Sequence, residues 1–158
     1  MKDEKETLRK TADSIHVMEK FDPAILADVT APVVSLYIPV HHTEREERRD
    51  IWDRDMFKDL MKDAERTLAE TYDKDAYKGI VEKADYLLEH PDMPLWLHAG
   101  EGLGFLMNND DIYVYNLFFA PDPMVAAGDT YFVKPLLRNF QYGTEYYCLL
   151  YTSPSPRD

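Results

Sequence analysis

The chain has 158 residues, of which 45% are hydrophobic and 13% aromatic, so one domain with a substantial core is expected. Its net charge of -12 repels phosphate backbones overall, so nucleic-acid binding requires a local basic patch. The single cysteine, Cys148, excludes a disulfide framework and a cysteine-ligated metal site.

The amino-terminal segment is charged and polar. The first ten residues, MKDEKETLRK, lack the apolar core of a signal peptide, and no run of about 18 apolar residues follows, so we expect a cytoplasmic protein outside the membrane. Weak helical spacing predicts a helical or flexible extension over residues 1–20. Asp22 followed by Pro23 is typical of a helix start, which predicts a short helix over residues 23–29.

The clearest strand is VVSLYI, residues 33–38, which is β-branched, aromatic and bounded by prolines. Its apolar residues on both faces predict an interior strand covered on each side. Apolar residues at helical spacing then predict helices over residues 46–70 and 75–89. In the first helix the apolar stripe includes Trp52, whereas Asp53 is expected on a polar face.

The remaining third of the chain is mostly strands and turns. We predict a hairpin of two strands, a loop, a short strand and a short helix, at residues 103–107, 112–119, 120–129, 131–133 and 134–140. This order predicts an α/β (α+β) fold, in which a mixed β-sheet packs against a pair of long antiparallel helices.

The last eleven residues, CLLYTSPSPRD, resemble one translated reading frame of an adapter used in DNA sequencing libraries. We therefore expect residues 148–158 to be a tail foreign to the protein, and the chain to be truncated after about Tyr147. The alternative is a natural tail rich in serine and proline. Under the first interpretation residues 143–147 begin a strand of a missing second domain.

Catalytic and cofactor motifs are weak in this sequence. Glycines at positions 100, 102 and 104 precede a strand, unlike a phosphate-binding loop, and are expected to serve a tight turn with positive φ. His41 and His42 are adjacent on an extended segment and point apart, so they are expected to be solvated loop histidines and not metal ligands. Ser35 lies inside the buried strand, a poor position for a nucleophile. We predict no cofactor, no metal site and no catalytic residue.

One local basic cluster exists, at the start of the long helix. Its five members are Arg45, Arg48, Arg49, Arg54 and Lys58. Acidic residues are interleaved with them, so one interpretation is a solvated, salt-bridged helix start. The functional interpretation is contact with RNA phosphates, in which arginines position the backbone without reading bases. Trp52 and Trp96 could stack on bases. The helical stripe favours a core position for Trp52, and Trp96, which follows Pro94, is expected to pack the loop against the sheet.

Several segments in series resemble the amino-terminal domain of the bacterial archaeo-eukaryotic release factor family. The segments that carry the resemblance are VVSLYIPVHH, FKDLMKDAERTL, LWLHAGEGLGFLMNNDDIYVYNLFFAP and GDTYFVKPLLRNF. They include a Ser-to-Pro strand motif at residues 35–39, Lys58-x-Leu60, a Gly-Leu strand start at residues 102–105 and Lys-Pro-Leu-Leu at residues 134–137. The resemblance spans roughly residues 23–147 and assigns residues 21–142 to this domain.

The resemblance implies a translation-associated role. Release factors of this kind carry a Gly-Gly-Gln tripeptide in their second domain, and this chain contains none. They read stop codons through Asn-Ile-Lys-Ser near the start of the corresponding helix, where this chain has RRDIWD over residues 48–53. Codon reading and hydrolysis are therefore not carried over, and the resemblance implies only a ribosome- or tRNA-associated domain.

Three hypotheses remain open at this point. The first is a release-factor-like domain, non-catalytic by itself, that contacts the ribosome or tRNA through the basic cluster. The second is an acidic protein–protein interaction domain without RNA binding. The third is the regulatory domain of an enzyme whose catalytic part lies beyond Tyr147.

Overall fold

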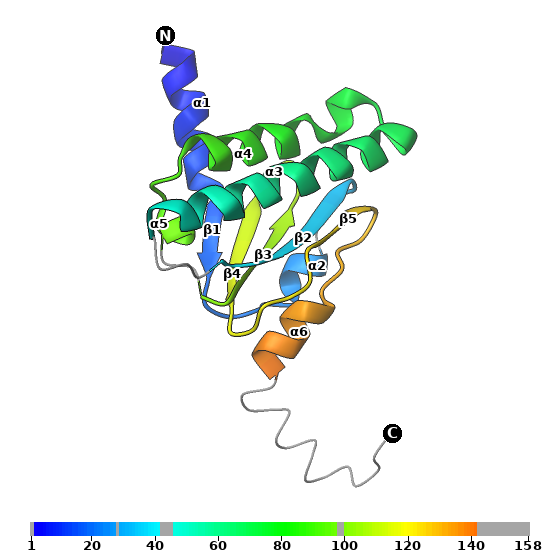
Figure 1. Cartoon of the computed structure of the whole chain (residues 1–158). Helices are drawn as coiled ribbons and strands as arrows, with labels where there is room; N and C mark the ends of the chain where they lie inside the picture. The colour runs from blue at the N-terminus through cyan, green and yellow to red at the C-terminus, as the bar shows by residue number, and fades with distance from the viewer. Residues whose placement is uncertain (1, 28, 42–45, 98–99, 142–158) are drawn as a thin grey trace, which may run out of the picture.

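The computed structural model describes residues 2–27, 29–41, 46–97 and 100–141. The predicted strand at residues 143–147 and the predicted tail at residues 148–158 lie outside these ranges. The described chain forms one five-stranded mixed sheet with helices on both faces (Figure 1). The predicted α/β class with a mixed sheet is therefore confirmed.

The sheet has the strand order β1-β4-β3-β2-β5. Only β1 and β4 pair in parallel, and the other neighbours are antiparallel. The hairpin of β3 and β4 matches the predicted one, with Met107 opposite Ile112 at its closed end. The strand bounds are Ile15–Met18 (β1), Val33–Pro39 (β2), Gly102–Met107 (β3), Ile112–Leu117 (β4) and Met124–Gly128 (β5).

Two helices run side by side over one face of the sheet (Figure 1). The first, α3, spans Glu46–Thr71, close to its predicted range. The second, α4, spans Lys78–Glu89 after a short 3-10 turn, η1, at Lys74–Tyr77, and is less than half as long as α3. The other helices are α1 (Lys2–Asp13), α2 (Ala24–Ala27), α5 (Pro94–Leu97) and α6 (Lys134–Gln141).

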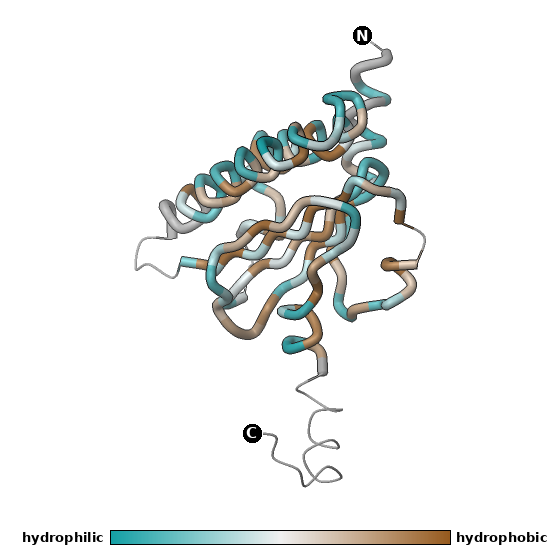
Figure 2. Tube along the Cα trace, turned by 90° about the vertical axis from the view of Figure 1, so that its right-hand side faces the viewer, coloured by the Kyte–Doolittle hydropathy of each residue, from teal (hydrophilic) through white to brown (hydrophobic). Residues whose placement is uncertain are grey.

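Two hydrophobic clusters lie on opposite faces of the sheet. Alternate residues of β2 point to opposite faces, so Leu36 joins the cluster beneath α3 and α4, whereas Tyr37 joins the cluster that contains Leu136 of α6. All residues from Val33 to Ile38 are buried, as predicted for an interior strand. The tube view shows the mostly hydrophobic strands below a helix of alternating character (Figure 2).

The first twenty residues are not wholly an extension. Helix α1 occupies most of the expected helical segment, but Ile15–Met18 forms the edge strand β1 and pairs with β4. The strand was not predicted because β1 has only four residues, too few to show a clear alternating pattern. The sheet therefore begins before residue 21, the expected domain boundary.

The fifth strand lies earlier in the chain than predicted. Met124–Gly128 forms β5 in place of the predicted loop, and residues 131–133 are not a strand. Side chains bond this segment to β2 instead: the Phe132 amide donates to Oγ of Ser35 at 2.8 Å, and the Tyr37 hydroxyl donates to the Phe132 carbonyl. Ser35 is thus a buried structural residue, as its strand position predicted.

Close packing, and not a positive φ angle, explains the glycine at the start of β3. None of the described glycines has positive φ, which corrects the expected turn conformation. A Cβ on Gly102 would lie 2.4 Å from Cδ of Pro121 and 2.7 Å from the carbonyl oxygen of Phe119. A side chain is therefore excluded at Gly102 by the loop that follows β4.

Candidate functional site

At the start of α3, Trp52 and Asp53 have the opposite burial to the one predicted from sequence. Phe57, Met61, Ala64 and Leu68 face the sheet, at the spacing of a buried helical stripe. Asp53 lies one turn before Phe57 on this same side and is 0% exposed, although a polar face was predicted for it. Trp52 is 49% exposed, so its predicted core position is wrong.

Asp53 is bonded to the end of β2 through one residue. Its Oδ1 accepts a hydrogen bond from the backbone amide of His41 at 3.1 Å and lies 2.9 Å from Nδ1 of the same histidine. Its Oδ2 is buried and has no hydrogen-bond partner among the described residues. The His41 side chain is 32% exposed, so the pair joins a buried carboxylate to a surface imidazole.

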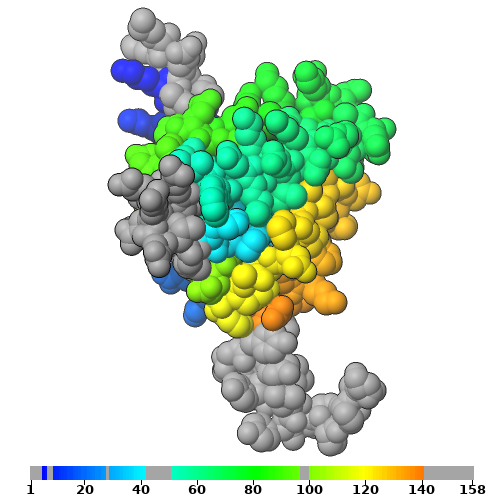
Figure 3. Space-filling model, viewed as in Figure 1, coloured from blue at the N-terminus to red at the C-terminus, as the bar shows by residue number. Residues whose placement is uncertain are grey.

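The exposed indole of Trp52 lies against this imidazole. The two ring centroids are 5.3 Å apart and the planes are nearly perpendicular, an edge-to-face contact. Ile51 beside it is also exposed, at 43%. In the space-filling view the described part of α3 lies at the surface above the sheet (Figure 3).

Trp96 has the opposite environment. It is 1% exposed, its Nε1 donates to the carbonyl of Leu87 at 2.9 Å, and its ring contacts Phe57 and Phe105. The predicted packing of Trp96 against the sheet is thus found, and of the two tryptophans only Trp52 presents a ring to solvent.

The structure describes the side chains of two of the five predicted RNA-binding cations, Arg54 and Lys58. Arg45 lies outside the described residues, and Arg48 and Arg49 lie in the first turn of α3, where the structure does not describe side chains. Their positions precede Trp52 by four and three residues, the spacing that places helix positions on one face. Arg48, Arg49 and Trp52 therefore share a face by position.

Arg54 and Lys58 lie toward α4 instead. Arg54 donates from Nη1 to the carbonyl of Leu88 in α4 at 3.4 Å. Lys58 is exposed and lines a hollow of about 110 Å³ between α3 and α4, with Met61, Val81 and Leu88. The structure thus separates these two cations from the face that carries Trp52.

The same hollow contains two carboxylates. Burial raises the pKa of Glu65, and the neighbouring Asp85 raises it further. Burial also raises the pKa of Asp85, with a smaller contribution from Glu89. These acidic groups lower the local potential beside Lys58, so this side of α3 is a poor surface for a phosphate backbone.

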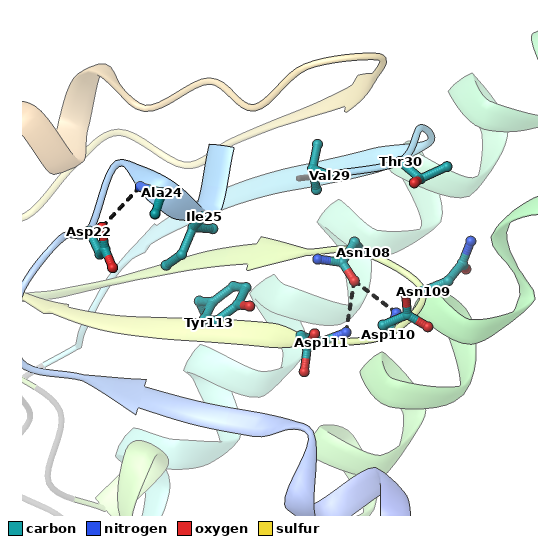
Figure 4. A pocket seen from close by; sticks show the side chains of 10 residues that line it. All are labelled: Asp22, Ala24, Ile25, Val29, Thr30, Asn108, Asn109, Asp110, Asp111 and Tyr113. Carbon is teal, nitrogen blue, oxygen red and sulfur yellow. Dashed lines mark hydrogen bonds between the residues drawn. The ribbon is translucent and has the colours of Figure 1, made fainter. Parts of the chain in front are cut away.

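A larger cavity, of about 510 Å³, lies at the other end of β2 (Figure 4). One wall is the β3–β4 turn, in which Oδ1 of Asn108 accepts the amides of Asp110 and Asp111 at 2.8 Å each. The opposite wall contains Asp22 and Ile25, and Tyr113 points toward it from β4.

This cavity is acidic, and residues of its wall contact one another. Among the described residues, its lining includes Asp22, Asp110 and Asp111 and no lysine or arginine. His16 of β1 lies 2.9 Å from Oδ1 of Asp111 and stacks on Tyr113, whose pKa is raised by burial and then by Asp111. The cavity thus repels phosphates and is a poor site for nucleic acid.

The roles of two residues of the candidate site were not predicted from the sequence. His41 was interpreted as a solvated loop histidine, and Asp53 as a solvated helical residue. The available signal was the four-residue spacing between Asp53 and Phe57, which places Asp53 on the buried side of α3. Among the residues that the structure describes, no three His, Cys, Asp or Glu side chains gather as a metal site.

Comparison of the chain with protein-family models and with curated proteins finds no match. In the part of the chain that the structure describes, no helix has both the length and the apolar character needed to cross a membrane.

Proposed function

We propose that this chain is the amino-terminal domain of a bacterial, cytoplasmic, release-factor-like protein, and that it contacts ribosomal RNA or tRNA through the start of α3. The observation that carries the proposal is the exposed indole of Trp52, on the helix face shared by positions 48 and 49. An exposed aromatic ring beside arginines is the usual combination for stacking a base while holding its phosphate.

The charge distribution favours one surface of the domain for contact with RNA. The chain carries a net charge of -12, and the cavity at the far end of β2 is lined by carboxylates. Repulsion from these groups leaves the Arg48 and Arg49 end of α3 as the approach for a polyanion. The domain binds and positions RNA in this proposal and carries out no chemistry by itself.

The proposal is tested by co-sedimentation with ribosomes. We expect the chain to pellet with ribosomes at about 50 mM salt and to be largely released at about 200 mM salt, because phosphate contacts weaken steeply with salt. Arg48→Ala with Arg49→Ala is expected to reduce the pelleted fraction at least about fivefold, because charged hydrogen bonds to phosphate are lost.

Lys58→Ala serves as the matched control, since it removes an exposed cation from the side of α3 that faces α4. It is expected to leave pelleting nearly unchanged. Pelleting that is insensitive to salt, or an equal loss in the control, would contradict the proposal.

A protein partner is the second candidate, because the exposed pair Ile51 and Trp52 forms an apolar surface. Apolar burial resists salt, so association that survives nuclease treatment and high salt would favour a protein partner. Co-sedimentation at two salt concentrations therefore separates the two candidates.

A further inference from the structure

The buried carboxylate of Asp53 has a specific task. Burial of a carboxylate is strongly unfavourable unless it is hydrogen-bonded, and one of its two oxygens, Oδ2, has no partner among the described residues. Oδ1 contacts two nitrogen atoms of His41, the backbone amide and Nδ1. The buried carboxylate of Asp53 thus fixes the position and orientation of the His41 imidazole at the surface, although its burial is unfavourable for stability.

The same contacts fix the tautomer of His41. Oδ1 of Asp53 accepts the backbone amide of His41, so it acts as an acceptor and requires the ring hydrogen on Nδ1. In the neutral ring Nε2 is then a hydrogen-bond acceptor. Nε2 has no protein partner among the described residues, and its ring contacts Trp52. An oriented acceptor therefore lies beside the exposed indole.

An acceptor in this place suits a hydroxyl donor. The imidazole contacts the indole, so the ribose of a base stacked on Trp52 is within reach of Nε2 when it lies on the imidazole side of the stack. The ribose 2′-hydroxyl is a donor that DNA lacks, and it is the group by which proteins distinguish RNA from DNA. A phosphate oxygen offers no hydrogen to Nε2, so the site favours the sugar over the phosphate.

We propose that His41, held by Asp53, accepts a hydrogen bond from the 2′-hydroxyl of the nucleotide whose base stacks on Trp52, so that the site selects single-stranded RNA over DNA. The inference rests on the proposed function and adds the chemical class of the ligand and the residue that selects it. The arginines supply affinity for either nucleic acid, and His41 supplies the preference.

The test uses the fluorescence of the whole chain. It has two tryptophans, of which Trp96 is buried and Trp52 exposed, so quenching by an added oligonucleotide reports on Trp52. Oligouridine and oligodeoxyuridine of equal length are titrated at the same low salt, since they differ only in the 2′-hydroxyl. We expect the ribo-oligomer to bind about fivefold more tightly, the effect of one hydrogen bond.

His41→Phe tests the assignment, because it keeps an aromatic ring against Trp52 but removes the acceptor. It is expected to bring the ratio of the two affinities close to one while changing the affinity for the deoxy-oligomer little. Trp52→Phe is the control for the signal and should abolish quenching, and urea unfolding establishes that both variants fold.

The possible results separate the two proposals. Equal affinity for the two oligomers in the unaltered chain, or a preference that survives His41→Phe, overturns the role of His41 and leaves RNA contact by α3 intact. Absence of quenching by either oligomer overturns the stacking site and the function proposed for it together.

Discussion

Phe57→Ala is expected to lower the free energy of unfolding by about 3–5 kcal/mol. The Phe57 side chain is fully buried between α3 and the sheet. Its ring centroid lies 4.8 Å from that of Phe105 in β3 and 5.7 Å from that of Trp96. Truncation removes buried apolar area and leaves a cavity that three rigid elements cannot close. Urea unfolding followed by circular dichroism measures the change.

The matched control is Phe118→Ala, because Phe118 is 58% exposed. The same loss of a phenyl group there is expected to change the free energy of unfolding by less than about 1 kcal/mol. Equal effects at the two positions would contradict the packing of α3 against β3 through Phe57.

Gly102→Ala is the second large expected effect, a loss of about 1–3 kcal/mol or more from overpacking. The added methyl group would meet Cδ of Pro121 at 2.4 Å and the carbonyl oxygens of Phe119 and Ile38 at 2.7 and 3.2 Å. Backbone atoms cannot rotate away, so β3 or the loop after β4 must shift. Thermal unfolding measured by circular dichroism should show a clearly lowered midpoint.

Gly128→Ala in the edge strand β5 provides the comparison. A Cβ there meets no atom within 4 Å, so the substitution is expected to be neutral or slightly stabilising through the entropy of the unfolded chain. A destabilisation as large as that of Gly102→Ala would show that helical or strand propensity, and not the close contact with Pro121, determines the effect.

The long-period features of the fold were predictable from sequence. The stripe through Phe57, Met61 and Leu68 predicted α3 almost to its ends, and the apolar run over residues 33–38 predicted a strand buried on both faces. These features repeat a signal over several turns or a whole strand, so no single exception hides them.

Short and edge elements were not predictable in the same way. β1 and β5 owe their place to pairing with β4 and β2, and with four and five residues they are too short to show a clear alternating pattern. Residues 131–133 carry a strong aromatic signal but are bonded to side chains of β2 and form no ladder. Tertiary pairing, which the sequence does not display, decides these elements.

The candidate site depended on the phase of one helix. A helical stripe drawn through every apolar residue predicts that Trp52 is buried and Asp53 is exposed. In the structure, the side of α3 that packs on the sheet carries Asp53, which is buried, and leaves Trp52 exposed. In this orientation of α3, Arg54 and Lys58 lie toward α4, away from positions 48 and 49. Of the five predicted cations, Arg54 and Lys58 therefore lie on a different side of α3 from positions 48 and 49.

The central claim, that the start of α3 binds RNA, is tested most directly by the salt dependence of affinity for a single-stranded oligoribonucleotide. We predict a linear fall of log K with log salt, with a slope that becomes shallower by about 1.4 in the Arg48→Ala, Arg49→Ala variant, since each phosphate contact on a single strand contributes about 0.7. A slope near zero in the unaltered chain, or one that the double substitution leaves unchanged, would contradict the claim.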